Sequence, residues 1–247
     1  MICWLLAADK ETGNLKMKKL TRIASALMAC FWLTNYAVSQ TVDLESGLVA
    51  YYPFNGNAYD ESGNANNGEV NGATLAEDRF GEAGKAYSFN GTGDRVSIPH
   101  TTVWDFGKDD LTYSCWFKLP DTIGYKSIFA STSDFWLGAF VLDDRMNYFA
   151  SSNGNNWDMF CGNCGGISAS GSIELKANEW YQFTFTRMEN EWIGLINGQP
   201  DYAVTHPGTL ISKNENKQIG RWGDGGLWFN GVIDDIRLYN RALSEAE

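Results

Sequence analysis

Apolar residues recur at every second position through most of the chain after residue 47. This alternation is typical of strands that bury one face, because successive side chains of a strand point to opposite sides of the sheet. No window of about 11 residues shows a convincing helical period. The alternation predicts strands at Leu48–Phe54, Ala86–Asn90, Arg95–Pro99, Leu111–Leu119, Ser127–Ser131, Trp136–Leu142, Met146–Ala150, Trp180–Met188, Trp192–Asn197, Lys217–Arg221 and Leu227–Tyr239.

Asn-Gly dipeptides lie beside or between these runs. Both residues tolerate a positive φ, which tight hairpins between twisted strands require. We therefore predict turns at residues 55–56, 71–72, 90–91, 153–154, 197–198 and 230–231, and short hairpins at Met188–Trp192 and Asp143–Asp144. Many short strands at this spacing predict an all-β fold, a two-sheet antiparallel β-sandwich of the jelly-roll type.

The first 39 residues do not follow the strand pattern. Basic residues at Met17–Lys19 precede an uncharged apolar stretch, Ile23–Leu33, and small residues follow at Ala37–Ser39. This order is typical of a secretory signal peptide, and the apolar stretch is too short to span a membrane. We expect cleavage before Gln40; lipid attachment at Cys30 is the alternative.

These features predict three parts of the chain. Residues 1–16 precede the better start at Met17 and are expected to be a spurious extension, residues 17–39 form the signal peptide, and residues 40–247 form one jelly-roll domain. The protein is accordingly expected to be secreted, periplasmic or at the cell surface, without membrane insertion after the signal is removed.

Composition narrows the classes of partner. The chain has 247 residues, of which 44% are hydrophobic and 14% aromatic, and this excludes a disordered chain. Residues 1–39 hold five of the 19 basic and two of the 30 acidic residues, so the remaining chain has a net charge of −14. A field of that sign repels phosphate backbones and anionic lipids, and so we expect no nucleic-acid partner.

Three cysteines lie beyond the signal peptide. Cys115 is in a predicted strand and is expected to be a buried free thiol. Cys161 and Cys164 are close in sequence, so in an oxidising compartment we predict a disulfide between them. The alternatives are a reduced, inert pair or a metal or redox site, although zinc would need two further ligands and only His100 and His206 are available.

Four segments, in order, resemble a known family. They are Leu48–Asn64, Ala86–Gly91 with Asp94–Pro99, Trp180–Arg187 and Gly231–Ser244. Together they resemble laminin-G-like jelly-roll domains of the concanavalin A-like lectin/glucanase superfamily, and the resemblance extends from about Leu44 to the last residue. It implies a concanavalin A-like fold and a non-catalytic sugar-binding or adhesive module, in many members with calcium. Because fold does not determine function, sites are considered separately.

A structural calcium ion is the expected cofactor. Residues 55–71 hold nine Asn, Asp or Glu residues, and calcium prefers such oxygen ligands. We predict Asp60 and Asn67 as ligands from this loop, with Asp234 and Asp235 from the last strand. Alternation would place one of these two aspartates on the same face as Val232 and Ile236. The alternative is a solvated Asn-rich turn, with Asp234 or Asp235 paired to an arginine.

A glycan or glycosylated surface is the expected partner. Sugar rings stack on exposed aromatic faces while amides and charged groups bind the hydroxyls. Trp136, Trp157 and Trp222 lie in or near predicted loops, and Asn156 precedes Trp157, so we predict these four residues as the carbohydrate site. The alternative is that these tryptophans fill the space between the sheets.

No enzyme signature is present. Retaining glycosidases place two carboxyl groups about 5–5.5 Å apart, typically on one strand of this fold, and no such carboxylate pattern occurs. Serine-hydrolase and zinc-protease motifs are also absent. The sequence therefore predicts a binding module. A structural or protein-binding adhesion segment is the alternative, and a polysaccharide hydrolase or lyase is the least favoured interpretation.

Overall fold

The computed structural model describes residues 42–132, 136–160, 169–223 and 227–247. The chain divides into two units, Met1–Val42 and Asp43–Glu247, and all the described strands lie in the second. Within the described residues, no helix is long and apolar enough to cross a membrane.

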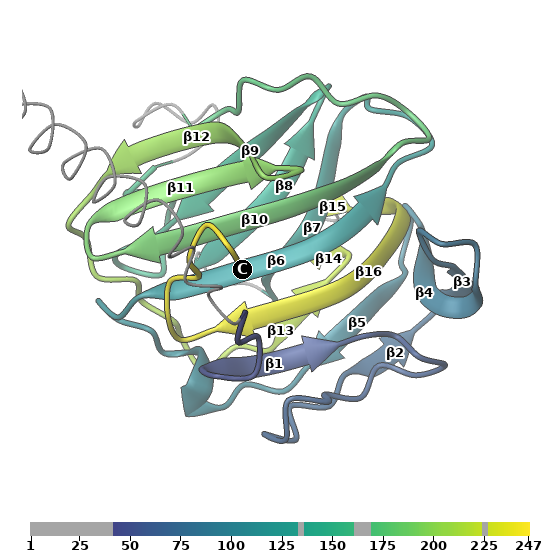
Figure 1. Cartoon of the computed structure of the whole chain (residues 1–247), viewed down its shortest axis with the longest axis horizontal. Helices are drawn as coiled ribbons and strands as arrows, with labels where there is room; N and C mark the ends of the chain where they lie inside the picture. Colours follow the sequence, from purple (N-terminus) through teal and green to yellow (C-terminus); the bar gives the residue numbers. More distant parts are fainter. Residues whose placement is uncertain (1–41, 133–135, 161–168, 224–226) are drawn as a thin grey trace, which may run out of the picture. The chain divides into compact units, whose positions relative to one another are not determined.

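The larger sheet has eight antiparallel strands in the order β12-β11-β10-β6-β16-β4-β3, with β1 also paired to β16 (Figure 1). Its strands are β1 (Leu48–Tyr52), β3 (Thr74–Glu77), β4 (Ala83–Asn90), β6 (Leu111–Lys118), β10 (Trp180–Met188), β11 (Glu191–Ile196), β12 (Gln199–Thr205) and β16 (Asn230–Tyr239). In this sheet β6 and β16 are central, and each alternates buried and half-buried residues along most of its length.

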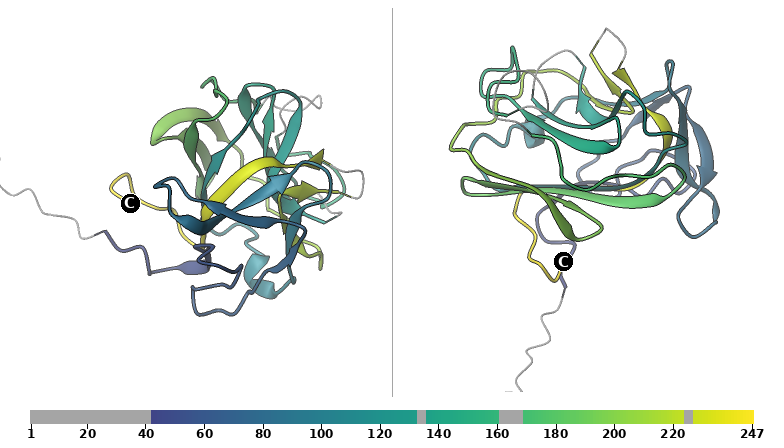
Figure 2. Two further views of the ribbon diagram at one scale, coloured as in Figure 1. Left: turned by 90° about the vertical axis from the view of Figure 1, so that its right-hand side faces the viewer. Right: turned by 90° about the horizontal axis from the view of Figure 1, so that it is seen from above.

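The second sheet has six antiparallel strands in the order β2-β5-β13-β7-β8-β9. They are β2 (Glu69–Asn71), β5 (Arg95–Ile98), β7 (Tyr125–Ser131), β8 (Leu137–Leu142), β9 (Arg145–Ala150) and β13 (Lys217–Ile219). A short ribbon of β14 (Arg221–Trp222) and β15 (Leu227–Trp228) packs against β7, and one 3₁₀ turn, η1, spans Thr102–Trp104. Figure 2 shows the two sheets edge-on as two layers, which confirms the predicted β-sandwich.

The main core lies between the two sheets and is rich in aromatic residues. Trp104 and Trp136 meet edge to face with ring centroids 6.3 Å apart, and Tyr113 stacks on Phe129 at 4.8 Å. Cys115 is also buried here as a free thiol, as predicted, and burial raises its pKa to about 12. Cys161 and Cys164 lie outside the described residues, so their disulfide stays a prediction.

Most of the predicted turns are present, but one is wrong. Asn197 and Gly198 both have a positive φ, 51° and 73°, and close the hairpin between β11 and β12. In contrast, Asn230 and Gly231 do not form a turn, because they begin β16 and pair with β4. The Cα of Gly231 lies close to the backbone of Lys118, where a side chain would collide with the carbonyl oxygen, and this close approach explains the glycine.

The ends of this unit meet in the larger sheet. Leu48 at the start of β1 pairs with Tyr239 at the end of β16. Arg241 then donates a hydrogen bond from Nε to the carbonyl of Ser46 at 2.7 Å and forms an ion pair with Glu247 at the same distance. The last strand is therefore joined to the first by both backbone and side-chain contacts.

Candidate functional site

Two predicted tryptophans come together on the outer face of the six-stranded sheet. Along β8 and β9, Ala139 and Tyr148 point into the main core, while Phe140 and Phe149 point outward, as strand alternation requires. Trp157 and Trp222 pack over these two phenylalanines. We call the four residues Phe140, Phe149, Trp157 and Trp222 the aromatic platform.

The two indoles of the aromatic platform lie side by side. The ring centroids of Trp157 and Trp222 are 5.8 Å apart and the planes are tilted by 40°. Both rings meet Phe140 nearly edge-on, with centroids 6.3 Å and 5.9 Å away, and Trp157 also contacts Phe149 at 5.3 Å. Both tryptophans remain half-buried, so the cluster supports them from below while part of each indole reaches solvent.

The loop that carries Trp157 is held by its own polar side chains. Asp158 accepts hydrogen bonds from the backbone nitrogen and hydroxyl of Ser152, at 2.7 and 2.6 Å, and from the Asn153 amide at 2.9 Å. Burial raises the pKa of Asp158, but the Ser152 hydrogen bonds outweigh this and lower it below its usual value. This network fixes the loop before any ligand arrives, which reduces the entropy lost on binding.

Amide side chains precede Trp157 in its loop. Asn156 is exposed beside Trp157, and its Oδ1 accepts a hydrogen bond from Asn153 at 2.7 Å. Asn155 accepts a hydrogen bond from the Lys213 ammonium at 2.7 Å. The loop that carries Trp157 thus also carries the hydrogen-bonding groups that a sugar site needs.

Trp136 does not belong to this surface, which corrects the sequence-based prediction. Its side chain is 0% exposed and packs against Trp104 and Phe106 in the main core. The Lys217 ammonium lies 4.4 Å from its ring centroid. A ring enclosed in this way has no free face for a sugar, so Trp136 fills the space between the sheets.

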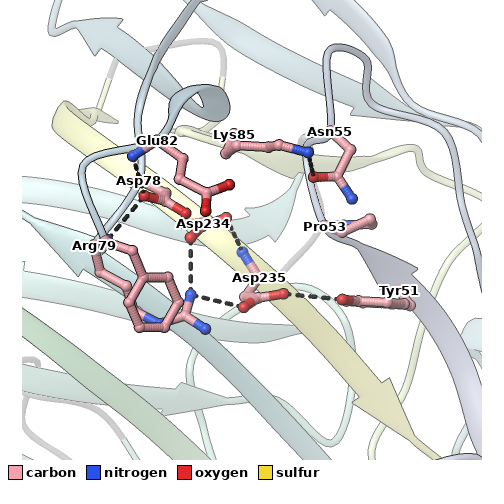
Figure 3. Close-up of a pocket in the computed structure, with 10 residues that line it drawn as sticks. Tyr51, Pro53, Asn55, Asp78, Arg79, Glu82, Lys85, Asp234 and Asp235 are labelled. Carbon is pink, nitrogen blue, oxygen red and sulfur yellow. Dashed lines mark hydrogen bonds and ion pairs between the residues drawn. The ribbon is translucent and has the colours of Figure 1, made fainter.

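The aspartates predicted as metal ligands in the last strand line a different, polar pocket of about 290 Å³ (Figure 3). We call it the Arg79 pocket. Its lining residues are Tyr51, Pro53, Asn55, Asp78, Arg79, Phe80, Glu82, Lys85, Asp234 and Asp235. Arg79 was not identified from the sequence, although pairing of Asp234 or Asp235 with an arginine was the alternative considered.

A bulge in β16 places both aspartates on the outer face of the larger sheet. The register with β6 shifts between Asp234 and Arg237, and Asp235 has a left-handed φ of 49°. Ile233 and Ile236 consequently both point into the core, whereas strict alternation would separate them. The prediction that Val232 and Ile236 share a face is therefore wrong.

Arg79 links the two carboxylates. Its Nη1 atom lies 2.9 Å from Oδ2 of Asp234 and 2.7 Å from Oδ2 of Asp235. Burial and the adjacent charge of Asp235 raise the pKa of Asp234 to about 7, although Arg79 acts in the opposite direction. Asp235 also accepts a hydrogen bond from the Tyr51 hydroxyl at 3.1 Å.

Asp60 and Asn67 make a separate arrangement. The Asp60 carboxylate accepts three backbone N–H bonds, from Tyr51, Ser62 and Asn66, each at 2.9 Å. Its own backbone nitrogen donates to Oδ1 of Asn67 at 2.9 Å. The carboxylate thus closes the loop as a hydrogen-bond acceptor.

This geometry does not fit one calcium ion shared by the four predicted ligands. Calcium takes about six to eight oxygen ligands. The Asp60 oxygens already accept backbone hydrogen bonds, and the Arg79 guanidinium lies between the other two carboxylates. In the part of the chain that the structure describes, no group of three or more His, Cys, Asp or Glu side chains is arranged to hold a metal ion. Calcium binding stays a prediction.

The pKa of Asp234 leads to a test by pH. Its usual value is 3.8, so between about pH 4 and 7 the folded protein binds more protons at this site than the unfolded chain. The free energy of unfolding contributed by Asp234 therefore falls as pH rises through this window. In urea unfolding, we expect the free energy of unfolding of Asp234→Asn to equal that of the wild type near pH 4. Near pH 8 it should exceed the wild-type value by on the order of 2 kcal/mol.

Asp121→Asn is the control with the opposite sign. Its hydrogen bond with Lys126 lowers the pKa of Asp121, so its charge stabilises the fold at neutral pH. That variant should lose stability near pH 8 relative to pH 4. If Asp234→Asn also loses stability near pH 8 relative to pH 4, the ion pair with Arg79 stabilises the charged Asp234 more than burial destabilises it.

Several solved structures share the fold of this chain. Domain 4 of AbnA, a GH43 extracellular arabinanase from Geobacillus stearothermophilus, was solved in complex with arabinotriose; it matches with a TM-score of 0.61 and 20% identity over 81% of this chain and 95% of that domain. The binding domain of Paraclostridial Mosquitocidal Protein 1 matches with a TM-score of 0.66 and 18% identity over 83% of this chain. At these identities the likeness shows the fold alone.

A botulinum neurotoxin DC binding domain, solved in complex with SialylT, matches with a TM-score of 0.60 and 13% identity over 83% of this chain. The chain spans about half the length of these two toxin domains, 51% and 50% respectively. It therefore corresponds to one part of each.

Sequence comparison identifies the family. No curated protein sequence matches the chain. A family model, Laminin_G_3, described as concanavalin A-like lectin/glucanases superfamily, matches residues 90–247, which is more than half of the chain. The match confirms the resemblance of the sequence motifs, and the two antiparallel sheets agree with it. The chain belongs to the concanavalin A-like lectin/glucanases superfamily.

Proposed function

We propose that the protein is a secreted, non-catalytic carbohydrate-binding module that holds a glycan or a glycosylated surface on its aromatic platform. The observation that carries this proposal is the pair of half-buried indoles, Trp157 and Trp222, 5.8 Å apart and flanked by amide side chains. Aromatic faces of this kind stack on sugar rings and cost little conformational entropy to fix. The signal-like segment before Gln40 supports export.

A binding role without catalysis agrees with the similar structures. AbnA domain 4 is one domain of an arabinanase, and its structure contains arabinotriose. The two toxin domains are described as binding domains. Arabinotriose is therefore a reasonable first probe, together with a broad glycan array, for a chain whose own ligand is to be identified.

We expect the full chain to bind at least one glycan of this set. Trp157→Ala and Trp222→Ala should each weaken that binding by roughly tenfold, equal to about 1.4 kcal/mol, because each removes one stacking face. Titration calorimetry on the wild type and both variants measures the effect, and far-UV circular dichroism checks that the variants are folded.

Trp180→Ala is the matched control. Trp180 is also half-buried, but it lies in β10 of the other sheet beside Lys118. This variant should bind as the wild type does. Equal affinity in both platform variants would exclude the aromatic platform as the binding site, and the absence of any glycan binding would favour a protein-binding adhesion role instead.

A further inference from the structure

The Arg79 pocket has no role in the function proposed above and lies on the opposite side of the sandwich from the aromatic platform. Asp234 pairs with Trp116 on the outer face of the eight-stranded sheet, whereas the platform covers the outer face of the six-stranded sheet. At about 290 Å³ the pocket is at the small end of ligand sites, which typically measure about 300–1,000 Å³. A ligand for it is therefore a single small ring.

The floor of the Arg79 pocket is rigid. The Arg79 guanidinium is held from one side by Asp234 and Asp235. It also contacts two aromatic rings, with its central carbon 4.8 Å from the centroid of Trp116 and 4.4 Å from that of Phe80. Two ion pairs, two cation–π contacts and the Tyr51 hydrogen bond to Asp235 leave the floor little freedom to rearrange.

The rim carries donors and acceptors with spare capacity. Lys85 uses one ammonium proton for Oδ1 of Asn55, at 2.9 Å, which leaves two further protons. Glu82 is exposed at the pocket, and Asp78 uses only Oδ1 to hold the turn through the nitrogens of Phe80 and Glu82. Figure 3 shows the carboxylates of Asp78 and Glu82 turned toward Asp234 and the Lys85 ammonium turned toward Asn55.

An exposed aromatic ring completes the rim. The Phe80 side chain is 73% exposed although it stacks on Arg79, so one face remains open to solvent. Exposure of a phenylalanine at a hairpin turn has an energetic cost that packing within this chain does not relieve. A sugar ring presents an apolar face for such a ring and hydroxyl groups, each both donor and acceptor, for the mixed polar rim.

We propose that the Arg79 pocket is a second carbohydrate site, which takes one neutral sugar residue at the end of a glycan chain. At about 290 Å³ the pocket has room for one ring. Phe80 stacks on the ring, Lys85 donates to its hydroxyl oxygens, and Glu82 and Asp78 accept from its hydroxyl groups. The choice of a sugar as ligand rests on the proposed function. The position and polarity of the pocket are observed in the structure and do not depend on that function.

Saturation-transfer NMR on the full chain tests this with a panel of monosaccharides: arabinose, glucose, galactose and N-acetylglucosamine. At least one should receive saturation, and Phe80→Ala and Lys85→Met should each weaken its binding at least fivefold. Glu82→Gln should weaken it less, because the amide still accepts one hydrogen bond. Glu77→Gln is the matched control, since Glu77 is exposed in β3 of the same hairpin but does not line the pocket.

Trp222→Ala separates this proposal from the previous one. Monosaccharide binding that survives Trp222→Ala but is lost in Phe80→Ala supports the pocket, whatever the platform does with longer glycans. Binding that is lost in Trp222→Ala and kept in Phe80→Ala would place the sugar on the platform and overturn the pocket. No saturation of any panel member would also overturn it, even if arabinotriose or an array glycan binds through the platform.

Discussion

Asp60→Ala should lower the free energy of unfolding by about 3–5 kcal/mol, since it leaves three backbone N–H groups without their acceptor and each costs about 1–3 kcal/mol. The carboxylate is buried, and its three hydrogen bonds of 2.9 Å join β1 to the loop before β2. For a domain of this size, ~1 kcal/mol shifts the melting temperature by roughly 2–4 °C, so a fall of about 6–20 °C is expected in a calorimetric scan.

Asn57→Ala is the control for this loop. Asn57 accepts a single hydrogen bond, from the nitrogen of Tyr59, in an exposed turn, and its loss should change stability by less than about 1 kcal/mol. Scans with and without chelator address calcium separately. If chelator leaves the wild type unchanged while Asp60→Ala melts early, Asp60 acts through its hydrogen bonds alone. If chelator lowers the melting temperature of the wild type to that of Asp60→Ala, Asp60 acts as a calcium ligand and the interpretation above is wrong.

Arg187→Met should lower the free energy of unfolding by about 3 kcal/mol, because it removes the shared donor of three backbone carbonyl groups. Arg187 lies in β10 and is 1% exposed. Its guanidinium donates to the carbonyls of Glu189, Gly107 and Gly208 at 2.9, 2.9 and 3.1 Å. Burial lowers the pKa of Arg187, with Asp110 and Asp109 opposing, but an arginine stays protonated in this environment.

Arg187→Lys distinguishes shape from charge. A lysine keeps the charge but cannot reach three carbonyls as the planar guanidinium does, so it should recover less than half of the loss in urea unfolding. Arg145→Met is the control, because Arg145 also donates to backbone carbonyls but its side chain is 40% exposed. A change below about 0.5 kcal/mol is expected there. Full recovery by Arg187→Lys would mean that the charge alone matters.

Arg187 also connects stability to the aromatic platform. Gly208, which it holds, precedes Leu210, whose nitrogen donates to the Gly107 carbonyl at 2.7 Å. Ile211 then donates to the carbonyl of Ser151, and Lys213 reaches Asn155. The segment from Gly208 to Lys213 thus supports the loop that carries Trp157, and its loosening in Arg187→Met should weaken glycan binding as well.

The sequence predicted the strands that have a buried face and missed three edge strands that bury few residues. The central strands β6 and β10 match the predicted ranges closely because one face of each lies in the core. β2, β3 and β12 were missed, and few of their residues are buried. β12 also contains Pro200, which is tolerated because this strand lies at an edge of the sheet.

Site residues could be predicted only where nearby residues in the sequence determine whether a side chain reaches the surface. Trp157 and Trp222 were predicted from their places in or near loops, and the structure brings both together as half-buried rings. Trp136 was misassigned because a tryptophan beside a loop can turn inward, and only its packing against Trp104 shows which way it points. The contact of Arg79 with Asp234, 155 positions apart in the chain, depends on a bulge that alternation does not predict.

The pairing of β1 with β16 determines how this fold responds to mechanical load. Because the strands are antiparallel and Leu48 lies opposite Tyr239, a force that pulls residues 43 and 247 apart acts on one end of the ladder. Hydrogen bonds between these strands would then break one after another, as in unzipping, rather than all together in shear. The contacts of Arg241 with Ser46 and Glu247 lie at this end of the ladder and would have to break first. In single-molecule pulling, its replacement should therefore lower the force at which β1 detaches.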